Sequence, residues 1–236
     1  MNIDNPKIWS LTDGSQGMIS QTKGLANELS VNIKEIKTEI IFPWNKLQPG
    51  ILPVFNWIFK NNYKINTKNL ITCIIGGENN HYNFSKENTL DLCKRIKKLK
   101  SHNNEILVLT SRRTNKEIKH ILKKELSTMS TLWLGEGENP YEFAIYNSSY
   151  FIITSDSTSM ISEASISGKP IYVYQLPMKR KSKRFIRFHE EFKRMNITRD
   201  FNTLDKLENW TYTKLEESKR IAGIIKKRII ERKNES

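Results

Sequence analysis

Hydroxyl and carboxylate side chains gather in one short segment, Ser155-Asp-Ser-Thr-Ser159, which follows an apolar run and opens a predicted helix. The free N–H groups and the positive dipole end of a helix N-terminus favour an anion such as phosphate. Ser157 and Ser159 add hydroxyl donors, and Glu163 lies one turn further on, where it could reach a pair of ribose hydroxyls. These residue types indicate a nucleotide diphosphate site, although Ser and Asp also cap helices for stability alone.

Three further polar segments each follow an apolar run that is typical of a strand. They are Gly76-Gly-Glu-Asn79, Ser111-Arg-Arg113 and Gly135-Glu-Gly-Glu-Asn-Pro140. Ligands of an open parallel sheet bind outside the carboxyl ends of its strands, so several such loops at one edge favour an anion site. The glycine pair permits close backbone approach but is a weak signal, because no G-x-G-x-x-G or Walker pattern follows it.

Metal and serine-hydrolase chemistry find no support in the spacing of the residues. The four histidines form no metal-ligand pattern with Cys or with one another, and no G-x-S-x-G elbow is present. Asp13 and Glu138 are the candidate acids or bases, and sequence physics does not choose between them. We expect no metal and no cofactor.

The net charge of +14 gives a second, less specific signal. The sharpest basic cluster comprises Lys179, Arg180, Lys181, Lys183, Arg184 and Arg187. It is either a solvated loop leading into a helix or a surface that attracts sugar phosphates, nucleic acid or an acidic membrane. Nucleic acid is the weaker choice because no nucleic-acid-binding motif accompanies the charge.

The elements that must position these loops alternate along the chain. Apolar runs predict strands at 7–12, within 31–41, and at 70–75, 105–110, 131–134, 150–154 and 171–174. Helical patterns cover about 18–29, 54–59, 86–99, 115–126, 141–146, 158–167 and 213–232. Strands alternating with helices at this spacing predict an α/β fold with a parallel, doubly wound, Rossmann-like sheet.

The remaining features favour an intracellular protein. No apolar run approaches the roughly 20 residues that span a bilayer, and the N-terminus lacks the pattern of a signal peptide. Cys73 and Cys93 are the only cysteines and are expected to be reduced thiols in a cytosolic setting.

Several of these segments occur together in one known pattern. They are Trp9–Gly17 with Gln21 and Gly24-Leu-Ala26, Ile75–Gly77, Thr110–Arg113, Trp133–Tyr141, Thr154–Met160, Ser162–Ala164, Gly168–Pro170, and Arg184-Phe185 with Phe188-His189. Over 7–28 and about 70–201 the chain resembles the mitochondrial-fission (elongated-mitochondria) family. This bacterial and plant group is regarded as glycosyltransferase-like and of GT-B type.

The resemblance implies two Rossmann-like domains facing a cleft, with the acceptor on the first and the nucleotide-sugar on the second. Because so little chain precedes the regular half, residues 1–66 are expected to be a truncated N-terminal, acceptor-side region. Residues 67–236 would form the C-terminal Rossmann-like nucleotide-binding domain. The helix at 213–232 would then pack its apolar stripe back on the N-terminal region.

The resemblance also assigns roles to residues. It gives Ser157, Ser159 and Glu163 to the diphosphate and ribose of a nucleotide-sugar. The full expected donor set is Gly76, Gly77, Ser111, Arg112, Arg113, Glu138, Asn139, Ser155, Asp156, Ser157, Ser159, Met160 and Glu163. The acceptor side would comprise Asp13, Gly14, Gln16 and Gly17, with Asp13 as the catalytic candidate and no metal required.

Two functions follow from the resemblance. The first is a GT-B glycosyltransferase-like enzyme that uses a nucleotide-sugar donor in cell-surface glycan synthesis. It would be cytoplasmic and peripheral at the inner membrane face, with an anionic membrane surface or a lipid-linked acceptor as partner. The second is a non-catalytic scaffold or binding protein that retains the fold, which the shortened first half favours. A basic nucleic-acid-associated protein is the weaker third interpretation.

Overall fold

A computed structural model describes residues 8–12, 16–29, 33–37, 69–204, 206–215 and 217–234. The chain divides into two compact units, residues 1–54 with 215–236, and residues 55–214. We refer to these as unit 1 and unit 2. The helix expected near 54–59 lies outside the described residues.

Unit 2 is built on a six-stranded sheet in which every pairing is parallel. Its strands are β3 (Leu70–Ile75), β4 (Glu105–Thr110), β5 (Thr131–Trp133), β6 (Tyr150–Thr154), β7 (Ile171–Tyr174) and β8 (Thr198–Asp200). Their order across the sheet is β5-β4-β3-β6-β7-β8. This is the strand order of a doubly wound Rossmann fold.

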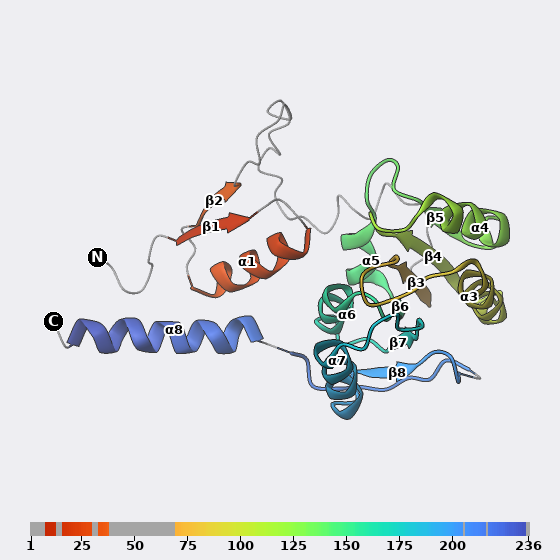
Figure 1. The fold of residues 1–236 in the computed structure, drawn as a ribbon. Helices are drawn as coiled ribbons and strands as arrows, with labels where there is room; N and C mark the ends of the chain where they lie inside the picture. The colour runs from red at the N-terminus through yellow and green to blue at the C-terminus, as the bar shows by residue number, and fades with distance from the viewer. Residues whose placement is uncertain are drawn as a thin grey trace. The chain divides into compact units, whose positions relative to one another are not determined.

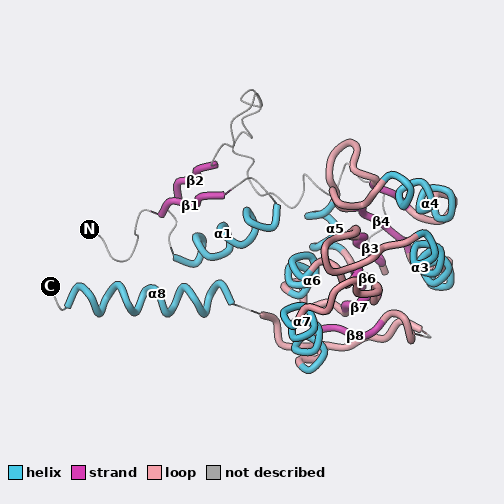
Figure 2. Tube along the Cα trace, viewed as in Figure 1, coloured by secondary structure: helices cyan, strands magenta, loops and turns pink. Residues whose placement is uncertain are grey.

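Helices cover both faces of this sheet, as Figure 1 shows: α3 and α4 lie on one side, and α5, α6 and α7 on the other. The helices are α3 (Lys86–Leu99), α4 (Lys116–Leu126), α5 (Tyr141–Asn147), α6 (Thr158–Ser165) and α7 (Lys183–Arg194). The loops that join strands to helices are traced in pink in Figure 2. The expected fold class, α/β with a Rossmann-like parallel sheet, is confirmed.

The core explains why the central strands read as unbroken apolar runs. All six residues of β3 are buried. Ile71, Cys73 and Ile75 pack with residues of α3 and α4, whereas Leu70 packs with Phe143 of α5 on the opposite face. A strand covered on both faces has no solvent side, so apolar and polar residues do not alternate along it.

Unit 1 contains a smaller parallel pair. β1 (Ile8–Thr12) pairs with β2 (Ile33–Lys37), and α1 (Gln16–Leu29) connects them. β1 and β2 lie within the segments 7–12 and 31–41, where strands were predicted. The last helix, α8 (Glu217–Asn234), contacts α1, and Lys226 Nζ donates to the Glu28 carbonyl at 2.6 Å.

α7 (Lys183–Arg194) was not among the predicted helices, and two further differences from the sequence expectation have physical reasons. α6 ends at Ser165 rather than at 167, since the chain leaves the helix before Gly168, whose φ is +72°. β8 was not expected, because its three residues, Thr-Arg-Asp, form no apolar run. No helix among the described residues is long and apolar enough to cross a membrane.

Candidate functional site

The strand order of unit 2 brings two of the loops that carry predicted site residues to one point of the sheet edge. β3, β4 and β5 follow one another outward in one direction, and β6, β7 and β8 in the other. The direction therefore switches between β3 and β6, and in open α/β sheets the ligand crevice lies outside the carboxyl ends at such a switch. Gly76-Gly77 follows β3 and the Ser155–Ser159 loop follows β6, so two of the four predicted loops meet here.

Asp156 is the centre of the polar contacts at this switch point. Its side chain is completely buried, and Oδ2 forms an ion pair with Arg113 Nη2 at 2.8 Å. Oδ2 also accepts the Gly77 N–H at 3.1 Å, and Oδ1 accepts the Thr154 hydroxyl at 2.7 Å. We call this set of contacts the Asp156 clamp. It ties together the loops after β3, β4 and β6.

The glycine pair fits against the clamp. A Cβ at Gly76 would lie 2.2 Å from the Asp156 carboxylate oxygens, and one at Gly77 would lie 2.1 Å from the Arg113 carbonyl oxygen. The Gly76 N–H donates to Thr154 Oγ1 at 2.8 Å. Both glycine N–H groups thus donate to acceptors of the protein itself. The groups that lie close to these glycines are the Asp156 carboxylate and the Arg113 carbonyl.

Both the side chain and the carbonyl of Ser155 are also engaged in contacts within the protein. It is fully buried, and its Oγ accepts the Leu176 N–H at 2.9 Å. Its carbonyl lies 2.9 Å from His189 Nε2 of α7. A carbonyl can only accept, so Nε2 carries the proton. Burial lowers the pKa of His189, against the opposing effects of this carbonyl and of Asp156.

The start of α6 is different, because its donors are not used. Ser157 is the N-cap residue, yet its side chain makes no capping hydrogen bond. Within the described residues, the first-turn N–H groups of Thr158, Ser159 and Met160 meet no acceptor outside the helix. Ser159 is exposed and Met160 half-buried. An uncapped helix start at the switch point is a ready anion site.

Glu163 lies one turn into α6 and is half-buried. Burial raises the pKa of its carboxyl, and a neighbouring tyrosine, Tyr141 of α5, opposes that rise. The Tyr141 hydroxyl is itself buried and makes no hydrogen bond of normal geometry. Tyr141, which closes the Trp133–Tyr141 segment, was not among the predicted site residues.

The other predicted donor-side residues are spread along the same edge. Ser111 Oγ accepts the Arg113 N–H at 3.2 Å, Arg113 is engaged in the Asp156 clamp, and Arg112 is exposed. Glu138 and Asn139 are exposed on the loop after β5, the outermost strand on that side. Asn139 Oδ1 accepts the N–H of Tyr141 at 3.1 Å. The structure therefore brings the loops after β3, β4 and β6 together and leaves 138–139 further out.

The predicted acceptor side belongs to unit 1. Asp13 and Gly14 lie outside the described residues, whereas Gln16 and Gly17 form the start of α1. Their role in binding an acceptor stays a prediction.

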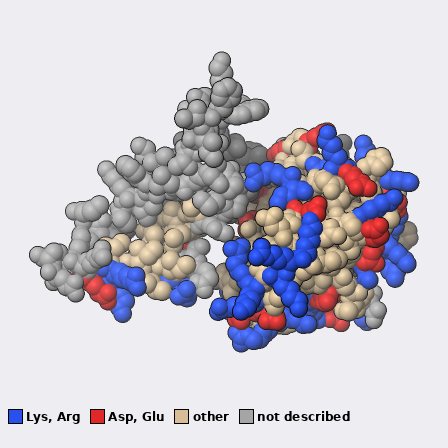
Figure 3. Space-filling view, in the orientation of Figure 1, with Lys and Arg blue, Asp and Glu red and all other residues tan. Residues whose placement is uncertain are grey.

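The basic cluster also belongs to the carboxyl edge of the sheet. Its six side chains are all exposed, on the loop between β7 and α7 and on the first half of α7. Lys179 pairs with Glu78, and its N–H donates to the His81 carbonyl at 2.9 Å, which joins this loop to the one after β3. Figure 3 shows Lys and Arg side chains crowded on the visible face of unit 2.

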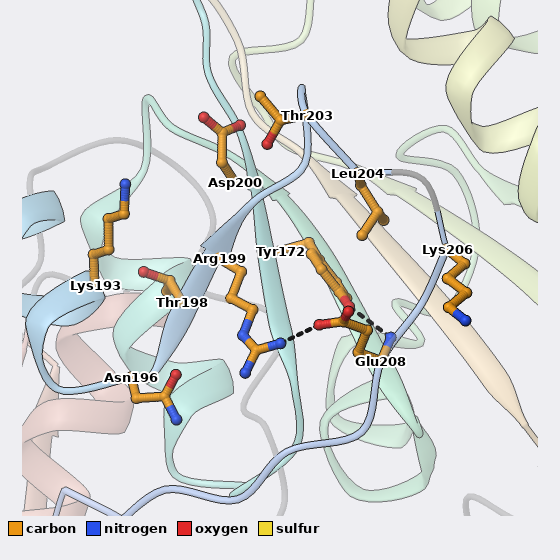
Figure 4. Close-up of a pocket in the computed structure, with 10 residues that line it drawn as sticks. All are labelled: Tyr172, Lys193, Asn196, Thr198, Arg199, Asp200, Thr203, Leu204, Lys206 and Glu208. Carbon is orange, nitrogen blue, oxygen red and sulfur yellow. Dashed lines mark hydrogen bonds and ion pairs between the residues drawn. The ribbon is translucent and has the colours of Figure 1, made fainter.

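Two surface hollows lie elsewhere. One, of about 530 Å³, lies beside β8 and contains the Arg199–Glu208 ion pair, with the Glu208 N–H donating to the Tyr172 hydroxyl (Figure 4). The other, of about 580 Å³, is lined by residues that precede β3, β6 and β7 and so lies at the amino edge. No group of His, Cys, Asp and Glu in the described ranges could hold a metal ion.

A family model described as Mitochondrial fission ELM1 matches residues 55–229. Uncharacterized protein RP120 of Rickettsia prowazekii (strain Madrid E) is 33% identical over 165 residues, which cover 67% of this chain and 46% of that protein. Mitochondrial fission protein ELM1 of Arabidopsis thaliana is 26% identical over 130 residues, covering 54% and 30%. The chain thus spans less than half the length of these relatives.

Similar solved structures are more distant. "S. aureus MnaA-UDP co-structure" matches with a TM-score of 0.42 and 14% identity, over 69% of this chain and 40% of that one. A UDP-N-acetylglucosamine 2-epimerase structure from Listeria monocytogenes, described there as putative, matches with a TM-score of 0.41 and 13% identity, over 74% and 40%.

Proposed function

Since the chain belongs to the Mitochondrial fission ELM1 family, we propose that unit 2 binds the nucleoside diphosphate part of a nucleotide-sugar donor, as in GT-B glycosyltransferases. One observation carries this proposal: the N-terminus of α6 is uncapped and lies at the topological switch point. The phosphates would accept from the first-turn N–H groups and from the hydroxyls of Ser157 and Ser159. Glu163 would accept from the ribose.

The charges around this helix start are compatible with an anion. Asp156 is the nearest carboxylate in sequence, but it is buried and neutralised by the Arg113 guanidinium. The Asp156 clamp would fix the loop that precedes α6, so the donors of α6 are held in place before a ligand arrives. Such preorganisation lowers the cost of ordering on binding.

The test is calorimetry with ADP, GDP, CDP and UDP. Ser157→Ala with Ser159→Ala should weaken the tightest of them by about 1–3 kcal/mol, because each neutral hydrogen bond contributes about 0.5–1.5 kcal/mol. Ser101→Ala is the matched control, since Ser101 is exposed on the loop that precedes β4, at the opposite edge of the sheet. Binding of no nucleoside diphosphate at millimolar concentration would refute the proposal.

A non-catalytic scaffold is the second candidate, and one observation favours it. The N–H groups of Gly76 and Gly77, which could have approached a ligand, are used within the protein. Release of nucleoside diphosphate from nucleotide-sugars separates the two functions. Turnover supports the transferase, whereas nucleotide binding without turnover against any acceptor tried supports the scaffold.

The basic cluster gives this proposal a partner. Lys179 pairs with Glu78, and the other five exposed cations of the cluster would attract an anionic membrane surface or the phosphate of a lipid-linked acceptor, at about 1 kcal/mol for each cation near the surface. Sedimentation with phosphatidylglycerol vesicles should therefore fall with added salt. Equal binding to phosphatidylcholine vesicles would contradict an electrostatic contact.

A further inference from the structure

Ser157, the residue that opens α6, has polar groups without partners although it is enclosed by the protein. It is only 8% exposed, yet its side chain makes no capping hydrogen bond. Within the part of the chain that the structure describes, its N–H meets no acceptor either. Buried polar groups in folded proteins are nearly always satisfied, so these two exceptions favour a ligand as their partner. An anion at the start of α6 would accept from both.

Asn79, in the loop after β3, contacts the peptide group that carries this N–H. Its Nδ2 donates to the Asp156 carbonyl at 3.3 Å. The other end of the amide settles its orientation, because Oδ1 accepts the N–H groups of His81 and Tyr82 at 2.8 and 2.9 Å. An amide oxygen accepts and an amide nitrogen donates, so the nitrogen must face the carbonyl of Asp156.

The loop that carries Asn79 is held in place by the loop after β7. The Asn83 N–H donates to the Pro177 carbonyl at 2.9 Å. Tyr82 and Met178 form an antiparallel bridge between the same two loops. Asn79 therefore approaches the start of α6 from a segment whose own position is fixed by backbone contacts.

In a trans peptide the C=O and N–H groups point in opposite directions, so a donor that holds the Asp156 carbonyl also fixes the direction of the Ser157 N–H. We infer that Asn79 is a positioning residue: it turns the peptide group between Asp156 and Ser157 so that the Ser157 N–H faces the phosphates of a bound nucleoside diphosphate. The same contact turns the negative end of a carbonyl dipole away from the anion. The inference rests on the proposed function, because it needs the phosphates to lie at the start of α6.

Two substitutions remove the Asn79 donor with different side effects. Asn79→Asp keeps the oxygen that accepts from His81 and Tyr82, but it adds a charge and places a second oxygen opposite the Asp156 carbonyl. Asn79→Ser adds no charge and keeps an acceptor for the turn, as serine does more weakly than asparagine, but its side chain is too short to reach Asp156 as well. Asn80→Asp and Asn80→Ser are the matched controls, since Asn80 is the next residue and is exposed.

Calorimetry with ADP, GDP, CDP and UDP, and with pyrophosphate, tests the inference. The Ser157 N–H would meet phosphate rather than ribose. Each Asn79 variant should therefore weaken the tightest nucleoside diphosphate and pyrophosphate by the same factor, about fivefold to tenfold for one hydrogen bond. The Asn80 variants should stay within about twofold of wild type, because solvent and salt screen an exposed charge. Urea unfolding checks that each variant is folded under these conditions.

Amide NMR provides a readout that a merely structural role would not move. In wild-type protein, pyrophosphate should shift the Ser157 amide proton downfield, because the N–H then donates to an anion. In both Asn79 variants this shift should be smaller at saturating pyrophosphate, whereas the amide protons of Thr158 and Ser159 should still respond.

The outcomes separate the inference from the proposed function. If wild-type protein binds a nucleoside diphosphate and the folded Asn79 variants bind it as well as the Asn80 variants do, the positioning role is overturned and the proposed function stands. A Ser157 amide shift in Asn79→Ser equal to that of wild type also overturns it. If Asn79→Asp does not fold, Asn79→Ser decides the outcome. If wild-type protein binds neither a nucleoside diphosphate nor pyrophosphate, the proposed function fails and the inference fails with it.

Discussion

Removal of the carboxylate at the Asp156 clamp should destabilise unit 2 strongly, although Asp156 lies in a loop. Asp156→Ala leaves the Gly77 N–H and the Thr154 hydroxyl without the acceptor that they have at 3.1 and 2.7 Å. Each buried donor left unsatisfied costs about 1–3 kcal/mol. The free energy of unfolding should therefore fall by about 2–6 kcal/mol.

Removal of the Arg113 guanidinium, the other partner of the ion pair, gives a second expected loss in the free energy of unfolding. Arg113→Ala leaves the Asp156 carboxylate fully buried without its cation, a kind of change that costs about 3–5 kcal/mol. Because 40% of the Arg113 side chain is exposed, solvent screens part of the ion pair and the lower end of that range is expected. Arg112→Ala is the matched control. Arg112 is exposed and forms no ion pair with any described residue, so its loss should cost less than about 0.5 kcal/mol.

Urea unfolding followed by tryptophan fluorescence measures all three variants. Trp133 and Trp210 lie in unit 2, whereas Trp9 and Trp44 lie in unit 1, so only part of the emission change reports on unit 2. Equal midpoints and slopes for Arg113→Ala and Arg112→Ala would show that the buried carboxylate does not depend on its cation, and would refute the reasoning.

Three further changes test other contacts. Gly77→Ala should destabilise the protein by about 1–3 kcal/mol, since its Cβ would meet the Arg113 carbonyl at 2.1 Å; a midpoint equal to that of wild type in urea would contradict this. Because burial raises the folded pKa of Glu163 above its ordinary 4.5, its contribution to stability is full below pH 4.5 and lost as pH rises through the folded value. Glu163→Gln should therefore gain stability relative to wild type with rising pH, and a constant difference in thermal midpoint would count against it. Burial lowers the folded pKa of His189 below its ordinary 6.5. The contribution of the neutral imidazole to stability is therefore full above pH 6.5 and is lost as the pH falls through the folded pKa. His189→Gln should remove this loss of stability between pH 6.5 and the folded pKa.

The sequence predicted the elements of unit 2 well where local pattern decides them. The strand at 70–75 and the helix at 86–99 have the observed bounds, because the first is an unbroken apolar run and the second begins at a Ser85–Asn88 capping box. β8 was not predicted from the sequence, because it is defined by its pairing with β7 and contains no apolar run.

The grouping of the polar loops could be predicted from the sequence only in part, because it also depends on tertiary structure. The sequence shows that polar loops follow strands, but the strand order, which places the loops after β3 and β6 side by side, is a tertiary property. Arg113 and Asp156 are distant in sequence, so their ion pair leaves no local signal.

The contact between α1 and α8 affects the order in which the chain can fold during its synthesis. Unit 1 is discontinuous, since its first part precedes residue 55 and its last part follows residue 214. Ribosomes add about 5–20 residues per second and domains tend to fold as they emerge. All of unit 2 is therefore synthesised before α8 exists, and the β1–α1–β2 segment spends about 10–40 s at these rates without the helix that α1 contacts. A released chain truncated after residue 214 should show protease-resistant unit 2 alongside an N-terminal segment that is still cleavable.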